Sequence, residues 1–357
     1  MTMRSVVVCC LVVLGSATAR AQEPFSVRVW TVFYADNTEF TGPYRDGDTI
    51  FGTSSRIALT VPIADNVRLR GGVFADNRFG SEKVFELVRP IAALAIGTPR
   101  NQVVLGTLDT ATHFGGPDLE GPHGLLAPLQ TETLAFDRAY EAGFQWLVNA
   151  PRVRQDAWLN WQKLNTPQHR EVFDAGMNSR AVLFGPLRAA FQGHVVHAGG
   201  QTFASGAVAD SYAFGPGAML EGKPPALDTV SLEVYALYSR YTPNREDQGT
   251  RLDGSGTFVR AAAAKWQWRA HVIWWQAQDF VTREGDANFL SIVRDGSYVS
   301  GTRKYVESGL ARTFNPADRV RAEFSARYHR IDSKTAYSYR ILGIVDLTYP
   351  IRRRTRP

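Results

Sequence analysis

Residues 318–349 alternate between apolar and polar side chains over two long runs, and this alternation constrains the fold more than any other feature. In the first run, apolar residues such as Phe324 and Tyr328 alternate with polar ones such as Glu323 and His329. Successive side chains of a strand point to opposite faces, so each run predicts a strand with one apolar face. Each run is about a dozen residues long, which matches the roughly 9–11 tilted residues that cross a bilayer. The pattern favours lipid-facing strands over the alternative, a long hairpin in a soluble sandwich.

The same pattern recurs along the rest of the chain and predicts an all-β fold, a closed antiparallel transmembrane β-barrel. Sixteen strands are the best interpretation, with fourteen and eighteen as alternatives. The predicted strands are 25–36, 49–62, 66–77, 84–97, 101–111, 139–150, 153–165, 170–184, 187–200, 206–221, 227–241, 253–264, 266–279, 302–315, 318–331 and 335–349.

The connections between these strands alternate in length. Every second one is short and rich in turn-forming residues, as at 98–100, 185–186 and 315–317, whereas 112–138, 242–252 and 280–301 are long. Outer-membrane barrels have short periplasmic turns at one end and long extracellular loops at the other. A soluble sandwich has no reason to alternate in this way.

The N-terminus predicts export. Arg4, an apolar run at 6–14 and a small-x-small site at 19–21 are typical of a signal peptide, which would contain both cysteines, Cys9 and Cys10. We therefore expect a signal peptide at 1–21, a barrel at 22–349, a basic tail at 350–357 and a location in the bacterial outer membrane. No later segment offers the roughly 18 consecutive apolar residues of a transmembrane helix.

The net charge of +6 comes from the two ends of the chain, because two arginines lie in the signal peptide and four in the tail. The neutral body argues against nucleic acid as a partner. Outer-membrane lipid and small hydrophilic solutes are the expected partners.

Side chains on the polar faces are predicted to line the lumen. Arginines outnumber carboxylates there, which favours anions as solutes. The alternative is that these arginines pair with carboxylates and water in a filled interior. The predicted inward residues are Arg28, Arg56, Arg68, Arg70, Arg180, Arg188, Arg269, Arg319, Arg321, Arg327, Glu141, Asp156, Asp174, Glu233 and Glu323.

The long connection 112–138 contains a Phe-Gly-Gly element followed by an acidic residue. In this element and in its strand plan the chain resembles the sixteen-stranded general porins, although Pro117 departs from their spacing. The resemblance implies a third loop that folds into the barrel and narrows it, and it implies trimers. The alternative is a surface loop whose glycines and prolines only build turns. The expected constriction residues are His113, Phe114, Gly115, Gly116, Asp118, Glu120 and His123.

Catalytic motifs are missing from the sequence. It has no Gly-x-Ser-x-Gly, His-Glu-x-x-His or cysteine-based metal spacing. His113 and His123 with nearby acids could form a cluster, whereas His194 and His197 lie on opposite faces of one strand and His329 is isolated. We therefore predict no enzyme, no catalytic residues, no metal and no cofactor. The predicted function is a porin-like channel for passive diffusion of small solutes; the alternative is an occluded barrel acting as a lipid-modifying enzyme or as an adhesion or assembly scaffold.

Overall fold

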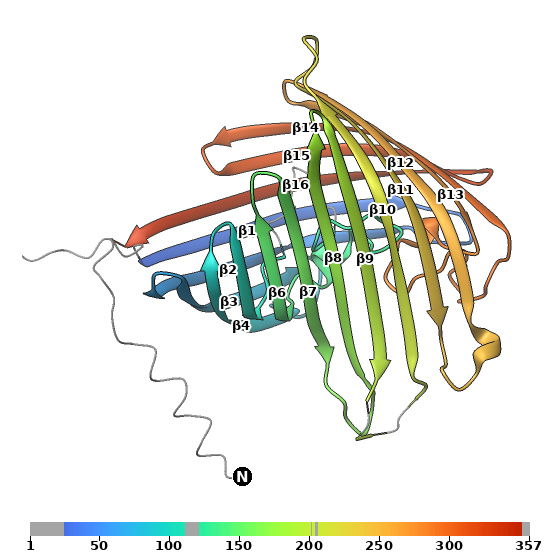
Figure 1. Cartoon of the computed structure of the whole chain (residues 1–357), viewed down its shortest axis with the longest axis horizontal. Helices are drawn as coiled ribbons and strands as arrows, with labels where there is room; N and C mark the ends of the chain where they lie inside the picture. Colours follow the sequence, from blue (N-terminus) through green and yellow to red (C-terminus); the bar gives the residue numbers. More distant parts are fainter. Residues whose placement is uncertain (1–24, 111–120, 201, 204–205, 352–357) are drawn as a thin grey trace, which may run out of the picture.

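The chain folds into a closed barrel of sixteen antiparallel strands, as the alternation predicts. The computed structural model describes residues 25–110, 121–200, 202–203 and 206–351. Each strand pairs with its neighbours in sequence, and β1 (Phe25–Glu39) pairs with β16 (Lys334–Ile351) to close the ring. Figure 1 shows β8 to β13 crossing the view at a steep angle to β14, β15, β16 and β1.

The remaining strands follow in chain order. They are β2 (Asp48–Ala64), β3 (Val67–Arg78), β4 (Leu87–Thr98), β5 (Asn101–Thr107), β6 (Ala142–Asn149), β7 (Val153–Lys163), β8 (Glu171–Phe184), β9 (Leu187–Gly199), β10 (Ala209–Gly222), β11 (Thr229–Thr242), β12 (Leu252–Lys265), β13 (Trp268–Gln278), β14 (Thr302–Ala317) and β15 (Val320–Ile331). Short helical turns are α1 (Leu134–Asp137), η1 (Gln248–Thr250) and η2 (Ala287–Phe289). Among the described residues, none of these helices has the length and apolar character needed to cross a bilayer.

The two ends of the barrel differ in their connections. At one end, the turn end, strands are joined by short segments such as 185–186, 266–267 and 318–319. At the other, the loop end, most connections are long, as at 108–141 and 279–301. The exception is the β15–β16 connection, which is only Asp332 and Ser333, with Asp332 at a φ of 53°.

Alternate residues face the lumen and the outside. On β15, Glu323 and His329 are buried, whereas Phe324 and Tyr328 are 47% and 52% exposed on the outer wall. The strands β5 and β6 are shorter than predicted, because the chain turns into the lumen at Leu108 and returns to the wall only at Ala142.

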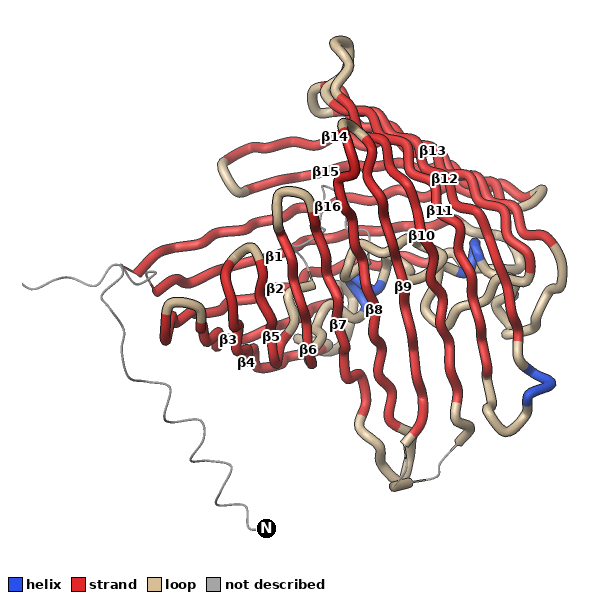
Figure 2. The backbone as a smooth tube through the Cα atoms, viewed as in Figure 1, coloured by secondary structure: helices blue, strands red, loops and turns tan. Residues whose placement is uncertain are grey.

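The loop end of the lumen is filled by three connections, from 40–47, 121–141 and 279–301. Leu125, Leu126 and Leu129 of the second connection pack in one apolar cluster with Phe280 and Phe289 of the third and with aromatic residues of the wall. Full burial of each leucine contributes about 1.5–3 kcal/mol. Figure 2 shows α1 and η2 between the walls, while η1 lies at the tip of an outer loop. We call these inward segments the plug.

Candidate active site

A hydroxyl, an imidazole, a phenol and a carboxylate form a continuous hydrogen-bonded chain at the loop end of the lumen. Ser338 Oγ lies 2.8 Å from His329 Nε2, and His329 Nδ1 lies 2.7 Å from the hydroxyl of Tyr305. That hydroxyl donates to Glu307 Oε2 at 2.6 Å. All four side chains are buried and point inward from three neighbouring strands, β14, β15 and β16. We call this set the Ser338–His329 chain.

Strand register places these groups side by side. Glu307 on β14 is directly opposite His329 on β15. Ser338 on β16 is directly opposite Arg327 on β15, which lies two residues before His329, so Ser338 and His329 are diagonal neighbours. Directly opposite residues in an antiparallel pair have Cβ atoms about 4.5–5.5 Å apart, so their side chains meet. The tight turn at 332–333 fixes the register and therefore the contact between serine and histidine.

The direction of the hydrogen bonds follows from what each group can donate. Glu307 as a carboxylate only accepts, so the hydroxyl of Tyr305 donates to it. In the neutral imidazole, the oxygen of Tyr305 then accepts the proton of His329 Nδ1, and His329 Nε2 accepts from Ser338. His271 Nε2 holds the other oxygen of Glu307 at 2.8 Å. This arrangement is that of a serine poised to lose its proton to histidine.

The Ser338–His329 chain borders a cavity of about 510 Å³ inside the barrel. Arg327 and Arg340 also line it, and both form ion pairs with Glu132 of the plug. From there the cavity extends to Trp266 and Trp268 at the turn end. Its volume lies within the range of about 300–1,000 Å³ that is usual for ligand pockets.

His123 lies in a second buried polar group. Its Nε2 is 2.8 Å from Glu141, its Nδ1 is 2.8 Å from Asp156, and its ring stacks on Trp158 with centroids 3.7 Å apart. Burial by itself lowers the pKa of His123, but the charges of Asp156 and Glu141 outweigh it and raise the pKa to about 10. The histidine is therefore protonated at neutral pH and ties the plug to the wall.

Stability should depend on pH through His123. Its pKa is higher in the folded chain than the ordinary value of 6.5, so its contribution is fully present below pH 6.5 and is lost as the pH rises towards about 10. We expect the free energy of unfolding to fall by a few kcal/mol, as an order of magnitude, over this window. Urea titrations at several pH values measure it. In His123→Gln this pH dependence should flatten, and an unchanged slope would refute the assignment.

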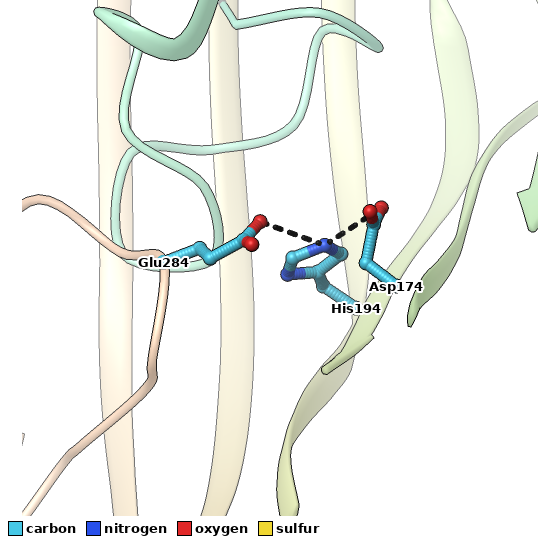
Figure 3. Close-up of side chains that lie close together, drawn as sticks. All are labelled: Asp174, His194 and Glu284. Carbon is cyan, nitrogen blue, oxygen red and sulfur yellow. Dashed lines mark ion pairs between the residues drawn. The ribbon is translucent and has the colours of Figure 1, made fainter. Parts of the chain in front are cut away.

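A third polar group joins the plug to β8 and β9. His194 Nε2 lies 3.5 Å from Asp174 and 3.6 Å from Glu284, and the three side chains point toward one another (Figure 3). Their ligand atoms lie within 4.8 Å of one another, a spacing at which a cation could bind. However, Arg138 makes a two-pronged contact with Glu284 at 2.6 and 2.8 Å and approaches Asp174 at 3.7 Å. The geometry therefore fits an ion-pair network, because Arg138 already supplies a positive charge to both carboxylates.

Several of the residues predicted to line a pore make ion pairs or hydrogen bonds. Arg28 contacts Asp346, Arg56 contacts Thr110, Arg68 contacts Gln102, Arg70 approaches Asp109 at 3.8 Å, Arg188 contacts Glu221, Arg269 approaches Glu323 at 3.5 Å, Arg319 contacts the Thr348 carbonyl, Arg327 contacts Glu132, and Glu233 contacts Arg260. Arg180 and Arg321 are half-buried, and Glu141, Asp156 and Asp174 belong to the buried groups described above. Whether these residues conduct solutes stays a prediction.

The predicted constriction residues are described only in part. His113, Phe114, Gly115, Gly116, Asp118 and Glu120 lie outside the described residues, whereas His123 is buried in the plug. Sequence reasoning missed the Ser338–His329 chain, because its members lie on three strands and His329 looked isolated. The signal that could have found it is the short turn at 332–333, since counting back from a two-residue turn places Ser338 close to His329.

Comparison with known proteins links this barrel to a family. The model of a family described as "Lipid A 3'-O-deacylase-type" matches residues 17–352. A search of curated proteins found no match.

Solved structures of outer-membrane proteins share the fold. A loop L8 deletion mutant of OmpT from Vibrio cholerae matches with a TM-score of 0.57 and 12% identity over 91% of this chain and 100% of that chain. An anion-selective porin from Comamonas acidovorans matches with a TM-score of 0.56 and 10% identity over 90% and 100%. OmpT is also described in a trimer form. At these identities the likeness shows the fold alone.

Two predictions change in the light of these matches. The prediction that the protein is not an enzyme is wrong, because the matching family is that of a deacylase. The resemblance to general porins holds for the barrel fold, but the predicted passive channel is not confirmed. The family match favours the alternative, a barrel that acts as a lipid-modifying enzyme.

Proposed function

Because the chain belongs to the lipid A 3'-O-deacylase-type family, we propose that it is an outer-membrane hydrolase that removes an ester-linked acyl chain from a lipid A-type glycolipid. The observation that carries this proposal is the Ser338–His329 chain, which brings a serine hydroxyl within 2.8 Å of an imidazole nitrogen beside a cavity. Acyl transfer needs such a pair of nucleophile and base. The proposed catalytic residues are Ser338 and His329, with Tyr305 and Glu307 positioning the imidazole.

In the proposed reaction, His329 Nε2 takes the proton of Ser338 as the serine oxygen attacks the ester carbonyl. The imidazolium is stabilised through Tyr305 by the negative charge of Glu307. Arg327, directly opposite Ser338, is the cation best placed by register to stabilise the oxyanion. The sugar hydroxyl leaves with the proton from His329, and water then releases the fatty acid from the serine by the reverse steps.

Access to the site is favoured at the β15–β16 hairpin. This part of the rim carries no long loop, since only Asp332 and Ser333 join the strands, and His329 is two residues before Ile331 at the strand end. Exposed cations Lys304, Arg330 and Lys334 lie at this rim. If the loop end faces the outer leaflet, they suit the phosphate groups of lipid A.

The proposal is tested with purified full-length protein in mild detergent mixed with lipopolysaccharide. Mass spectrometry of the lipid A should show loss of one acyl chain, and the missing mass should appear as free fatty acid. A planar-bilayer recording of the same sample is the companion measurement. Unchanged lipid A together with steady, salt-dependent conductance steps would contradict the hydrolase and favour the channel.

A further inference from the structure

A recess of about 450 Å³ lies at the turn end of the barrel, between the ends of β6 to β10. It is far along the strands from the Ser338–His329 chain, which lies at the loop end. Its charged lining is five arginines and one glutamate, namely Arg100, Arg152, Arg154, Arg180, Arg188 and Glu221. Among the described residues that line it, Glu221 is the one carboxylate.

Strand register forces these positive charges together. Arg154 on β7 is directly opposite Arg180 on β8, and Arg188 on β9 is two residues from Ala190, the partner of Arg180. The three share the lumen-facing side of the wall, since Arg154 is two residues from Asp156 and Arg188 is two residues from Ala190, and both Asp156 and Ala190 are buried. Like charges directly opposite each other destabilise a sheet, and long side chains also reach diagonal neighbours.

The lining holds one carboxylate against five guanidinium groups. Arg188 Nε donates to Glu221 Oε2 at 2.7 Å, so Glu221 lies at one edge of the recess beside Arg188. Arg100 and Arg152 come from the two neighbouring turns, 99–100 and 150–152, and are exposed. A concave surface lined by one sign of charge concentrates the potential and attracts counter-ions.

We propose that this recess is a binding site for a multivalent, phosphate-bearing anion that enters from the turn end. Guanidinium groups match phosphate oxygens in a two-pronged geometry, and several of them can share one ligand. Binding would relieve the repulsion between Arg154 and Arg180 that the strand register creates. The site is independent of the proposed deacylase, because none of its residues belongs to the Ser338–His329 chain.

The test is isothermal titration of purified full-length protein with pyrophosphate at constant ionic strength. We expect saturable binding that weakens about tenfold or more in the double variant Arg154→Gln/Arg180→Gln. The matched control is Arg269→Gln/Arg321→Gln, which removes two lumen-facing arginines near the turn end of the opposite wall and should leave the affinity unchanged. Equal weakening in both double variants would overturn the proposal, since it would reflect overall charge alone.

A single variant that is expected to bind more tightly separates a loss of binding from a loss of folding. Glu221→Gln removes the competing carboxylate, so it should tighten pyrophosphate binding several-fold; unchanged or weaker binding by this folded variant would contradict the site.

Two sources of phosphate are then separated in nanodiscs. If anionic phosphatidylglycerol in the disc lowers the affinity for pyrophosphate, the natural ligand is a lipid head group. If it does not, the ligand is a soluble phosphate compound. If pyrophosphate binds neither in detergent nor in nanodiscs, the recess is not a phosphate site for a lipid head group or for a soluble compound.

Discussion

Ser338→Ala should lower the rate of lipid A deacylation by about 10⁴-fold or more, because loss of the nucleophile from such a unit removes nearly all its contribution. The residual rate would come from substrate binding and from Arg327. Mass spectrometry of acyl release over time measures the effect. His329→Gln should cause a loss of similar size, and the double variant should be hardly slower than either single variant, because the two residues act as one unit.

The matched control for this prediction is Ser325→Ala. Ser325 is a serine that lines the same cavity, on the same strand as His329, but it is not a member of the Ser338–His329 chain. Its replacement should leave deacylation within about two-fold of the wild type, because it removes no group of the Ser338–His329 chain. If Ser338→Ala retains most of the activity, or if both variants lose it equally, Ser338 is not the nucleophile.

Removal of one partner from the buried ion-pair network should strongly destabilise the barrel. Arg138→Gln leaves Glu284 and Asp174 buried without their positive partner, which typically costs about 3–5 kcal/mol. Glu284→Gln conversely leaves the Arg138 guanidinium without the carboxylate of Glu284. The double variant should be less destabilised than the sum of the single variants, because neither charge is then left without the other. Urea titration of the folded barrel gives all three values.

An exposed ion pair supplies the control for this comparison of single and double variants. Arg294 and Asp46 are 54% and 68% exposed, so Arg294→Gln should cost less than about 1 kcal/mol. Additive effects of Arg138→Gln and Glu284→Gln, or single costs as small as that of Arg294→Gln, would show that the network does not hold the plug to the wall.

The barrel was predictable because its physical cause is local. Alternation of Phe324 and Tyr328 with Glu323 and His329 already indicates which side chains face outward, and the short turns favour sixteen strands over fourteen or eighteen. The filled lumen was harder to foresee. Leu125, Leu126 and Leu129 stand in a segment that is rich in glycine and proline, and their burial depends on wall residues far away in sequence, such as Trp275 and Tyr235.

The candidate active site could not be read from motifs, because no contiguous motif carries it. Alternation tells which face a side chain occupies, but it does not tell which residue of the next strand lies opposite. Tyr305, Glu307, His329 and Ser338 meet only through the register of two hairpins. The prediction of no enzyme treated His329 as a single histidine and not together with the serine that the 332–333 turn places beside it.

A fluorophosphonate, which reacts with activated serines, can show whether Ser338 is the nucleophile. After treatment of the folded protein, peptide mapping by mass spectrometry should find one adduct on Ser338, and His329→Gln should abolish it. An unmodified Ser338 in protein that still deacylates lipid A would show that Ser338 is not the nucleophile.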